Sequence, residues 1–124
     1  MKSSIYYNGA VLTIVITADG SESIKQLNSS HNKQTVRELA RAGALVKRLG
    51  DTGKLSSPDQ FRQEGVGFWA IRAGTVRLYG WYDPNQTFVI SHAISKRQQR
   101  LHPTDINRMQ NNKRLYEAPE GEKS

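Results

Sequence analysis

The chain has 124 residues, which suits one domain of two packed layers around a modest core. It contains no cysteine, and this excludes disulfides, cysteine-based metal sites and thiol nucleophiles. The formal net charge of +7 indicates a polyanionic partner such as nucleic acid, although a solvated basic surface would give the same sum.

The first half of the chain predicts a strand and two helices. Residues 11–17 are rich in β-branched side chains and predict a strand, to which residues 5–7 are expected to pair back as a short hairpin. A short helix is expected over residues 22–28. The clearest helix spans about residues 33–49, and Gly50 is its expected C-cap. Its apolar stripe consists of Val36, Leu39, Ala40, Gly43, Val46 and Leu49.

The second half predicts a meander of three strands followed by a helix. Residues 51–63 are polar and predict a loop. Strands are expected at residues 67–72, 76–82 and 87–95, joined by short turns. A basic loop then leads to a final helix that opens at Pro103, where proline is well tolerated.

These elements define an α+β fold. We expect a small twisted antiparallel sheet with the two N-terminal helices packed on one face and a short C-terminal helix. The other face of the sheet, or its rim, is expected to stay open. Residues 1–116 would form a single domain, and the polar tail 117–124 is expected to fray.

Several classes of protein receive no support from the sequence. The apolar run at residues 10–16 is too short to span a membrane, and no small-residue cleavage site follows it, so we expect a cytoplasmic protein with no membrane partner. The three histidines are too scattered for a metal site, and we expect no metal and no cofactor. Paired carboxylates, a glycine-rich phosphate loop and a Ser–His–Asp arrangement are also absent from the sequence pattern.

Four segments from residue 45 onward occur in an order that is typical of a known family. They are LVKRLGDTGKLSSPDQF, GFWAIRAG, TVRLYGWY and FVISHAISKRQQRLHPTDI. The last is the most specific, because a strand, an adjacent basic pair, a glutamine and a proline-led helix follow one another. On these segments the chain resembles the RelE/HigB superfamily of toxins, and the resemblance runs from about residue 45 to residue 116. Leu101-His102 departs from the threonine-proline pair that usually opens the last helix.

The resemblance implies an activity and a set of partners. Toxins of this family enter the ribosomal A site and cut mRNA without a metal, and an antitoxin encoded beside them holds them inactive. The expected partners are therefore the ribosome, mRNA and a cognate antitoxin of the helix-turn-helix type.

The RNA cleavage that the resemblance implies requires particular types of side chain in the active site. The nucleotide's own 2′-hydroxyl is the nucleophile, so the protein must orient it and offset charge on the phosphorane. Guanidinium groups suit phosphate because they are permanently charged and fork-shaped, and aromatic faces suit bases.

Strand alternation places Arg77 on one face with Tyr79 and Trp81. We expect Arg77 to contact the scissile phosphate, Arg72 or Lys96 to offset phosphorane charge, and Tyr79 to stack on a base or orient the hydroxyl. The predicted catalytic set is Arg72, Arg77, Tyr79, Lys96 and His92. The predicted RNA-binding set is Trp81, Arg97 and Arg100.

Structural roles for the same residues stay open. His92 falls in register with the family's histidine and could be an acid or base, but alternation places it with Phe88, Ile90 and Ile94, where it would be a partly buried packing residue. Arg72 could form a rim salt bridge, the aromatic residues could be covered by a loop, and the basic loop could be solvated.

Two other classes of function also stay open. One is a protein-binding member of the same superfamily, such as a gyrase inhibitor of the ParE type. The other is a basic RNA- or protein-binding module of phage or mobile-element origin that has lost its activity.

Overall fold

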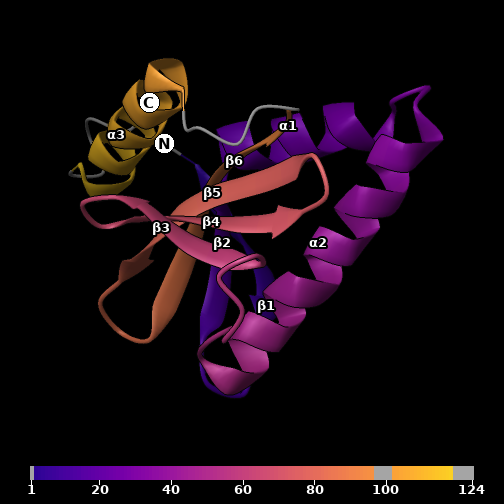
Figure 1. The fold of residues 1–124 in the computed structure, drawn as a ribbon. Coiled ribbons are helices and arrows are strands. Elements are labelled where there is room, and N and C mark those ends of the chain that lie inside the picture. Colours follow the sequence, from indigo (N-terminus) through magenta and orange to yellow (C-terminus); the bar gives the residue numbers. More distant parts are fainter. Residues whose placement is uncertain (1, 97–101, 119–124) are drawn as a thin grey trace.

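Six strands form one sheet in the computed structural model, which describes residues 2–96 and 102–118. The strands lie in the order β1-β2-β6-β5-β4-β3, as Figure 1 shows. Their bounds are β1 (Ser3–Asn8), β2 (Thr13–Thr17), β3 (Phe61–Gly65), β4 (Phe68–Ala73), β5 (Val76–Asp83) and β6 (Thr87–Ser95). The expected α+β class is confirmed.

The sheet is mixed, so the prediction of a wholly antiparallel sheet is wrong. Strand β2 runs parallel to β6, whereas the other neighbouring pairs are antiparallel. The reason is the connection: the chain passes through two helices after β2 and then forms the meander, whose last strand returns beside β2 in the same direction. The hairpin of β1 and β2 and the meander of β4, β5 and β6 are confirmed.

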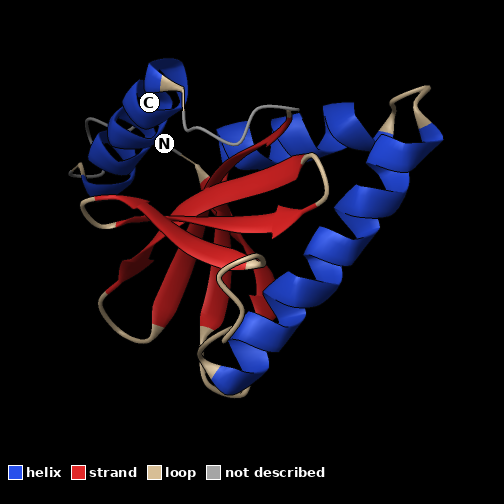
Figure 2. Cartoon of the chain, viewed as in Figure 1, coloured by secondary structure: helices blue, strands red, loops and turns tan. Residues whose placement is uncertain are grey.

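Helices α1 (Ala18–Asn28) and α2 (Lys33–Thr52) lie on one side of the sheet (Figure 2). Helix α1 begins earlier than expected, because the Thr17 hydroxyl at the end of β2 already accepts a hydrogen bond from the Gly20 amide. Helix α2 ends at Gly53, which adopts the left-handed conformation with φ of 82°. The prediction that Gly50 ends this helix is therefore wrong.

Gly50 instead provides a close contact inside the helix. A Cβ atom there would lie 3.0 Å from Cδ2 of Tyr7, and one on Gly9 would lie 2.2 Å from the Gly50 carbonyl carbon. The turn between β1 and β2 therefore packs directly on the last turns of α2.

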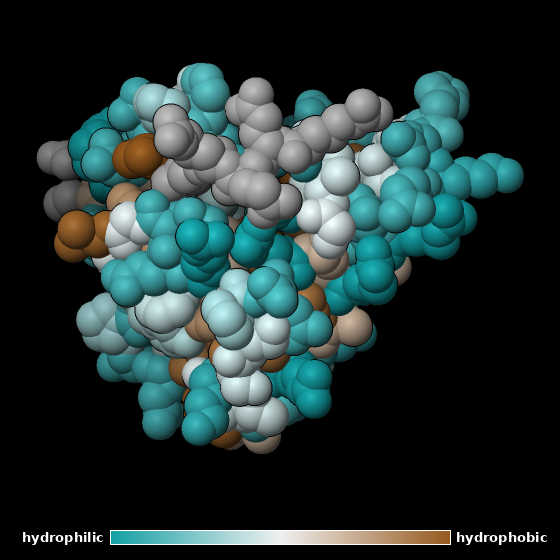
Figure 3. All heavy atoms as spheres, in the orientation of Figure 1, coloured by the Kyte–Doolittle hydropathy of each residue, from teal (hydrophilic) through white to brown (hydrophobic). Residues whose placement is uncertain are grey.

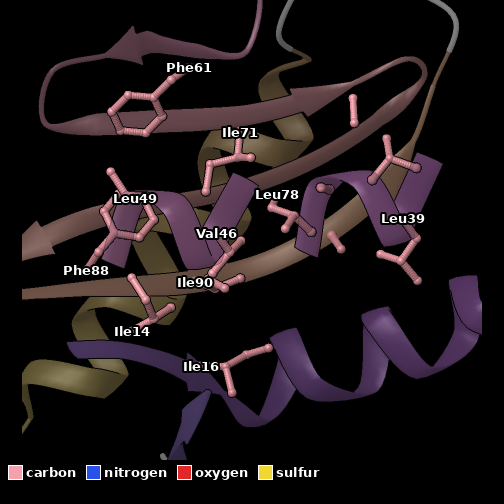
Figure 4. Close-up of a cluster of buried hydrophobic side chains, with 14 of the residues drawn as sticks. Ile14, Ile16, Leu39, Val46, Leu49, Phe61, Ile71, Leu78, Phe88 and Ile90 are labelled. Atoms are coloured by element: carbon pink, nitrogen blue, oxygen red, sulfur yellow. The ribbon is translucent and has the colours of Figure 1, made fainter. Parts of the chain in front are cut away.

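The main core lies between α2 and the sheet, and Figure 4 shows its side chains. From α2 it takes Leu39, Ala42, Val46 and Leu49, which recur at spacings of three and four residues. From the strands it takes, among others, Ile14, Ile16, Ile71, Leu78, Phe88 and Ile90. The predicted packing of this helix on the meander is confirmed, although Ala40 is exposed and Ala42 takes its place in the apolar stripe. Each fully buried aliphatic side chain contributes roughly 1.5–3 kcal/mol of hydrophobic free energy.

A buried carboxylate fixes α2 to the turn between β4 and β5. Glu38 is 3% exposed and accepts hydrogen bonds from the Thr75 amide (3.0 Å), the Thr75 hydroxyl (2.6 Å) and the Gln34 amide (2.9 Å). The bonds from Thr75 hold the pKa of Glu38 below its usual range. Gly74, with φ of 60°, leaves the room that this carboxylate occupies. The turn carries Arg72 and Arg77 on its two strands, so Glu38 positions both.

Helix α3 (Pro103–Glu117) covers part of the opposite face of the sheet. Met109 packs there with Phe68, Tyr79, Trp81 and Val89, and the ring of Tyr116 lies 6.0 Å from that of Trp81. The prediction that the whole of this face stays open is wrong, because the last helix carries apolar side chains that cover the aromatic row.

Strand β3 begins at Phe61, inside the segment 51–63 that was predicted to be a loop, and ends at Gly65. Its sequence is polar, and its residues Arg62 and Gln63 are exposed at the edge of the sheet. The ring of Phe61 stacks on that of Trp69 at 4.6 Å, and this contact holds the strand against β4. Within the described residues, no helix combines the length and apolarity needed to cross a membrane.

Candidate functional site

Two arginines face each other across strands β4 and β5. Arg72 is paired with Arg77 in the antiparallel ladder, and the two residues are 9% and 2% exposed. The guanidinium of Arg77 donates through Nη1 to the carbonyl oxygens of Gly74 and Val76. No carboxylate among the described residues lies within ion-pair distance of Arg77. Burial and the neighbouring charge of Arg72 lower its pKa, yet an arginine stays charged at neutral pH.

Tyr79 and Lys96 join this pair. Tyr79 is two residues beyond Arg77 on the same strand face, and the Lys96 ammonium lies 5.9 Å from the centre of its ring. The Lys96 amide donates to the Thr75 carbonyl, which anchors the lysine beside the start of β5. Burial raises the pKa of Tyr79 and lowers that of Lys96. We call Arg72, Arg77, Tyr79 and Lys96 the cationic cluster.

His92 lies next to this cluster, on a different face from the one that alternation predicted. Tyr79 pairs with His92 and Gly80 with Ile90, so Ser91 is an extra residue in β6. This bulge reverses the alternation: Phe88 and Ile90 face α2, whereas His92 faces the other side, and the centre of its ring lies 5.2 Å from that of Tyr79.

A chain of hydrogen bonds favours one tautomer of the neutral His92 ring. The Asn112 amide donates to the Ser91 hydroxyl (2.9 Å), which can then donate to Nδ1 of His92 (2.9 Å). Nε2 of His92 therefore carries the proton and donates to Asp105 (3.2 Å). Burial, followed by the charge of Arg108, lowers the pKa of His92, whereas Asp105 opposes that shift.

The structure thus brings together a serine, a histidine and an aspartate that the sequence pattern did not reveal. Ser91 and His92 have no exposed surface, and Asp105 is 8% exposed. This burial withholds the serine hydroxyl from a substrate in solution. The three residues form a packing network that joins β6 to α3.

A second polar contact fastens α3 to α1. The Arg108 guanidinium donates to both carboxylate oxygens of Asp19 at 2.7 and 2.6 Å, and the Asn112 amide also donates to Asp19. The bond from Arg108 is the main cause that lowers the pKa of Asp19. The partners are 89 and 93 residues apart in sequence, and no local pattern could have paired them.

Of the three predicted RNA-binding residues, only Trp81 lies within the part of the chain that the structure describes. Trp81 is fully buried under α3, and its Nε1 has no hydrogen-bond partner. Arg97 and Arg100 lie outside the described residues. Among residues 2–96 and 102–118, no group of three or more histidine, aspartate or glutamate side chains could hold a metal ion.

The buried histidine gives a pH dependence that can be measured. The groups that face His92 are Asp105 and Arg108 from α3, Asp19 from α1 and Tyr79 from β5. Its folded pKa lies below the unfolded value of about 6.5, so its contribution to stability is complete above that pH and is lost as the pH falls towards the folded pKa. We expect the free energy of unfolding to fall between pH 7 and pH 5, by at most about 1.4 kcal/mol per pH unit for one proton.

Urea denaturation of the wild type and of His92→Gln measures this effect. The variant should lack this part of the pH dependence, whereas His31→Gln, at an exposed position, should keep it. Parallel pH profiles for the wild type and His92→Gln would show that His92 is not the group that titrates.

Comparison with known proteins adds no relative: no family model matches the chain, and no curated protein matches its sequence.

Proposed function

We propose that this protein is the toxin of a toxin–antitoxin system and a metal-independent endoribonuclease that cuts mRNA on the ribosome. The observation that carries the proposal is the cationic cluster, in which Arg72 and Arg77 pair across β4 and β5 and the Lys96 ammonium lies over the ring of Tyr79. The net charge of +7 and the resemblance to the RelE/HigB superfamily support it. A cytoplasmic location and a helix-turn-helix antitoxin belong to the same proposal.

The cluster contains the groups that 2′-hydroxyl attack requires. Arg77 would bind the scissile phosphate, and Arg72 and Lys96 would offset the charge that develops on the phosphorane. Tyr79 would stack on a base or orient the hydroxyl. His92, which has no exposed surface, would position Tyr79 and α3 rather than touch the RNA.

One observation favours a second candidate. Arg77 and Tyr79 are 2% and 1% exposed, so RNA can reach them only after part of their cover moves. Met109 of α3 belongs to that cover. A superfamily member that binds RNA or protein without cutting would need no such movement.

Cleavage of a defined mRNA in a purified translation system separates the candidates. We expect the protein to cut ribosome-bound mRNA. Because ribosomes need magnesium, EDTA is applied to the protein alone before the protein is added to them, and this treatment should leave the cleavage rate unchanged. Intact mRNA after prolonged incubation would contradict the proposal. A gyrase supercoiling assay would then distinguish a ParE-type inhibitor from a non-cleaving RNA-binding module.

A further inference from the structure

A pocket of about 410 Å³ opens between α2, the segment before β3 and the end of β4. Small-ligand pockets have volumes of roughly 300–1,000 Å³, so this one can hold a molecule the size of a nucleotide. Its wall includes Arg41, Ala44, Leu45, Asp59, Gln60 and Arg72. Figure 3 is drawn in the orientation of Figure 1, and brown and tan apolar atoms are visible among teal polar ones in the middle of that face.

One side of the pocket attracts an anion. The Arg41 side chain is 64% exposed, and its only ion pair among the described residues is a long one, 3.8 Å, to Glu38. Glu38 already accepts hydrogen bonds from Thr75 and Gln34, so Arg41 is not needed to satisfy it. The guanidinium of Arg41 can therefore turn to a phosphate at little cost.

The remaining wall suits a flat ring that carries hydrogen-bonding groups. Ala44 and Leu45 give an apolar surface on consecutive positions of α2, whereas Asp59 and Gln60 bring a carboxylate and an amide from the segment before β3. A carboxylate accepts hydrogen bonds only, and guanine offers two adjacent donors, N1–H and the N2 amino group. We propose that the pocket binds a nucleotide, with its phosphate on Arg41, its base against Ala44 and Leu45, and guanine selected by Asp59.

Arg72 lines the pocket and is also the cross-strand partner of Arg77, but its side chain shares the sheet face of Arg77 and Tyr79, opposite the face that α2 covers. In an RNA substrate, the pocket would hold a nucleotide other than the one that is cut. That extension rests on the proposed function, whereas binding of a free nucleotide does not.

Titration of the full chain with GMP, UMP, guanosine and inorganic phosphate tests the proposal. Calorimetry should show saturable binding of GMP that is at least tenfold tighter than that of UMP, guanosine or phosphate. Arg41→Ala should weaken GMP binding at least tenfold. Arg48→Ala, which removes an exposed arginine two turns further along α2, should leave it unchanged. Asp59→Asn should abolish the preference for GMP over UMP.

Several results would overturn this assignment. They are the absence of saturable GMP binding at millimolar concentrations, equal affinity of Arg41→Ala and the wild type, phosphate binding as tight as GMP binding, or an unchanged base preference in Asp59→Asn. Urea denaturation confirms that each variant is folded. mRNA cleavage is measured separately, so a protein that cuts mRNA but does not bind GMP would refute the pocket and leave the proposed function standing. A protein that binds GMP but does not cut mRNA would refute the proposed function and leave the pocket assignment standing.

Discussion

Arg77→Ala is expected to reduce mRNA cleavage by about a hundredfold or more, because under the proposed function it removes the guanidinium that would bind the scissile phosphate. The same variant should no longer arrest growth when its synthesis is induced. Cleavage of a defined mRNA in a purified translation system gives the rate, and culture density after induction gives the effect in cells. Arg77→Lys should recover only part of the activity, because lysine keeps the charge and loses the two-pronged hydrogen bonding of the guanidinium.

Controls must separate catalysis from folding, because Arg77 is 2% exposed. Arg77→Met retains the apolar stem and much of the volume, so it should fold and still fail to cut mRNA. Arg62→Ala removes an exposed arginine from β3 and should leave cleavage unchanged. Growth arrest by Arg77→Ala at the wild-type rate would show that the cationic cluster is not the site. If His92→Ala folds and cuts mRNA while Arg77→Ala does not, the histidine has a structural role.

Elements with a strong local signal could be predicted from the sequence. The β-branched run that forms β2, the apolar stripe of α2 and the turn chemistry between the last three strands each specify their own element. Arg72, Arg77 and Tyr79 could be placed together because they lie on paired strands joined by a short turn. β3 could not be predicted, because its polar residues owe their strand conformation to pairing with β4 and to the stacking of Phe61 on Trp69.

The position of His92 shows where strand alternation fails. One extra residue in β6, Ser91, turns every later side chain of the strand to the opposite face. A glycine inside a strand often marks a bulge or a close approach of another backbone, and Gly80 stands opposite this bulge. Gly80 was therefore the feature of the sequence that could have indicated the bulge. The contacts of His92 with Asp105 and of Asp19 with Arg108 are tertiary, and they arise only once α3 has docked.

Gly80→Ala is therefore expected to be one of the most destabilising small substitutions in the chain. A Cβ atom at this position would lie 2.2 Å from the Val89 carbonyl oxygen and 2.8 Å from Cε2 of Phe88. The first of these is a backbone atom, so relief requires β5 and β6 to separate at the bulge. Overpacking of this kind typically costs about 1–3 kcal/mol and occasionally more, and the backbone clash places this variant at the upper end. The measurement is the free energy of unfolding from urea denaturation, with tryptophan fluorescence as the probe.

Gly65→Ala is the matched control, because it makes the same substitution in strand β3, where an added Cβ atom would meet nothing within 4 Å. Its stability should equal that of the wild type or exceed it slightly, since alanine restricts the unfolded chain more than glycine does. Because the bulge directs His92 towards Tyr79, Gly80→Ala should also weaken the pH dependence that His92 gives to stability. Equal free energies of unfolding for Gly80→Ala and Gly65→Ala would mean that β5 and β6 do not approach each other closely at the bulge, and the placement of His92 beside the cationic cluster would then be wrong as well.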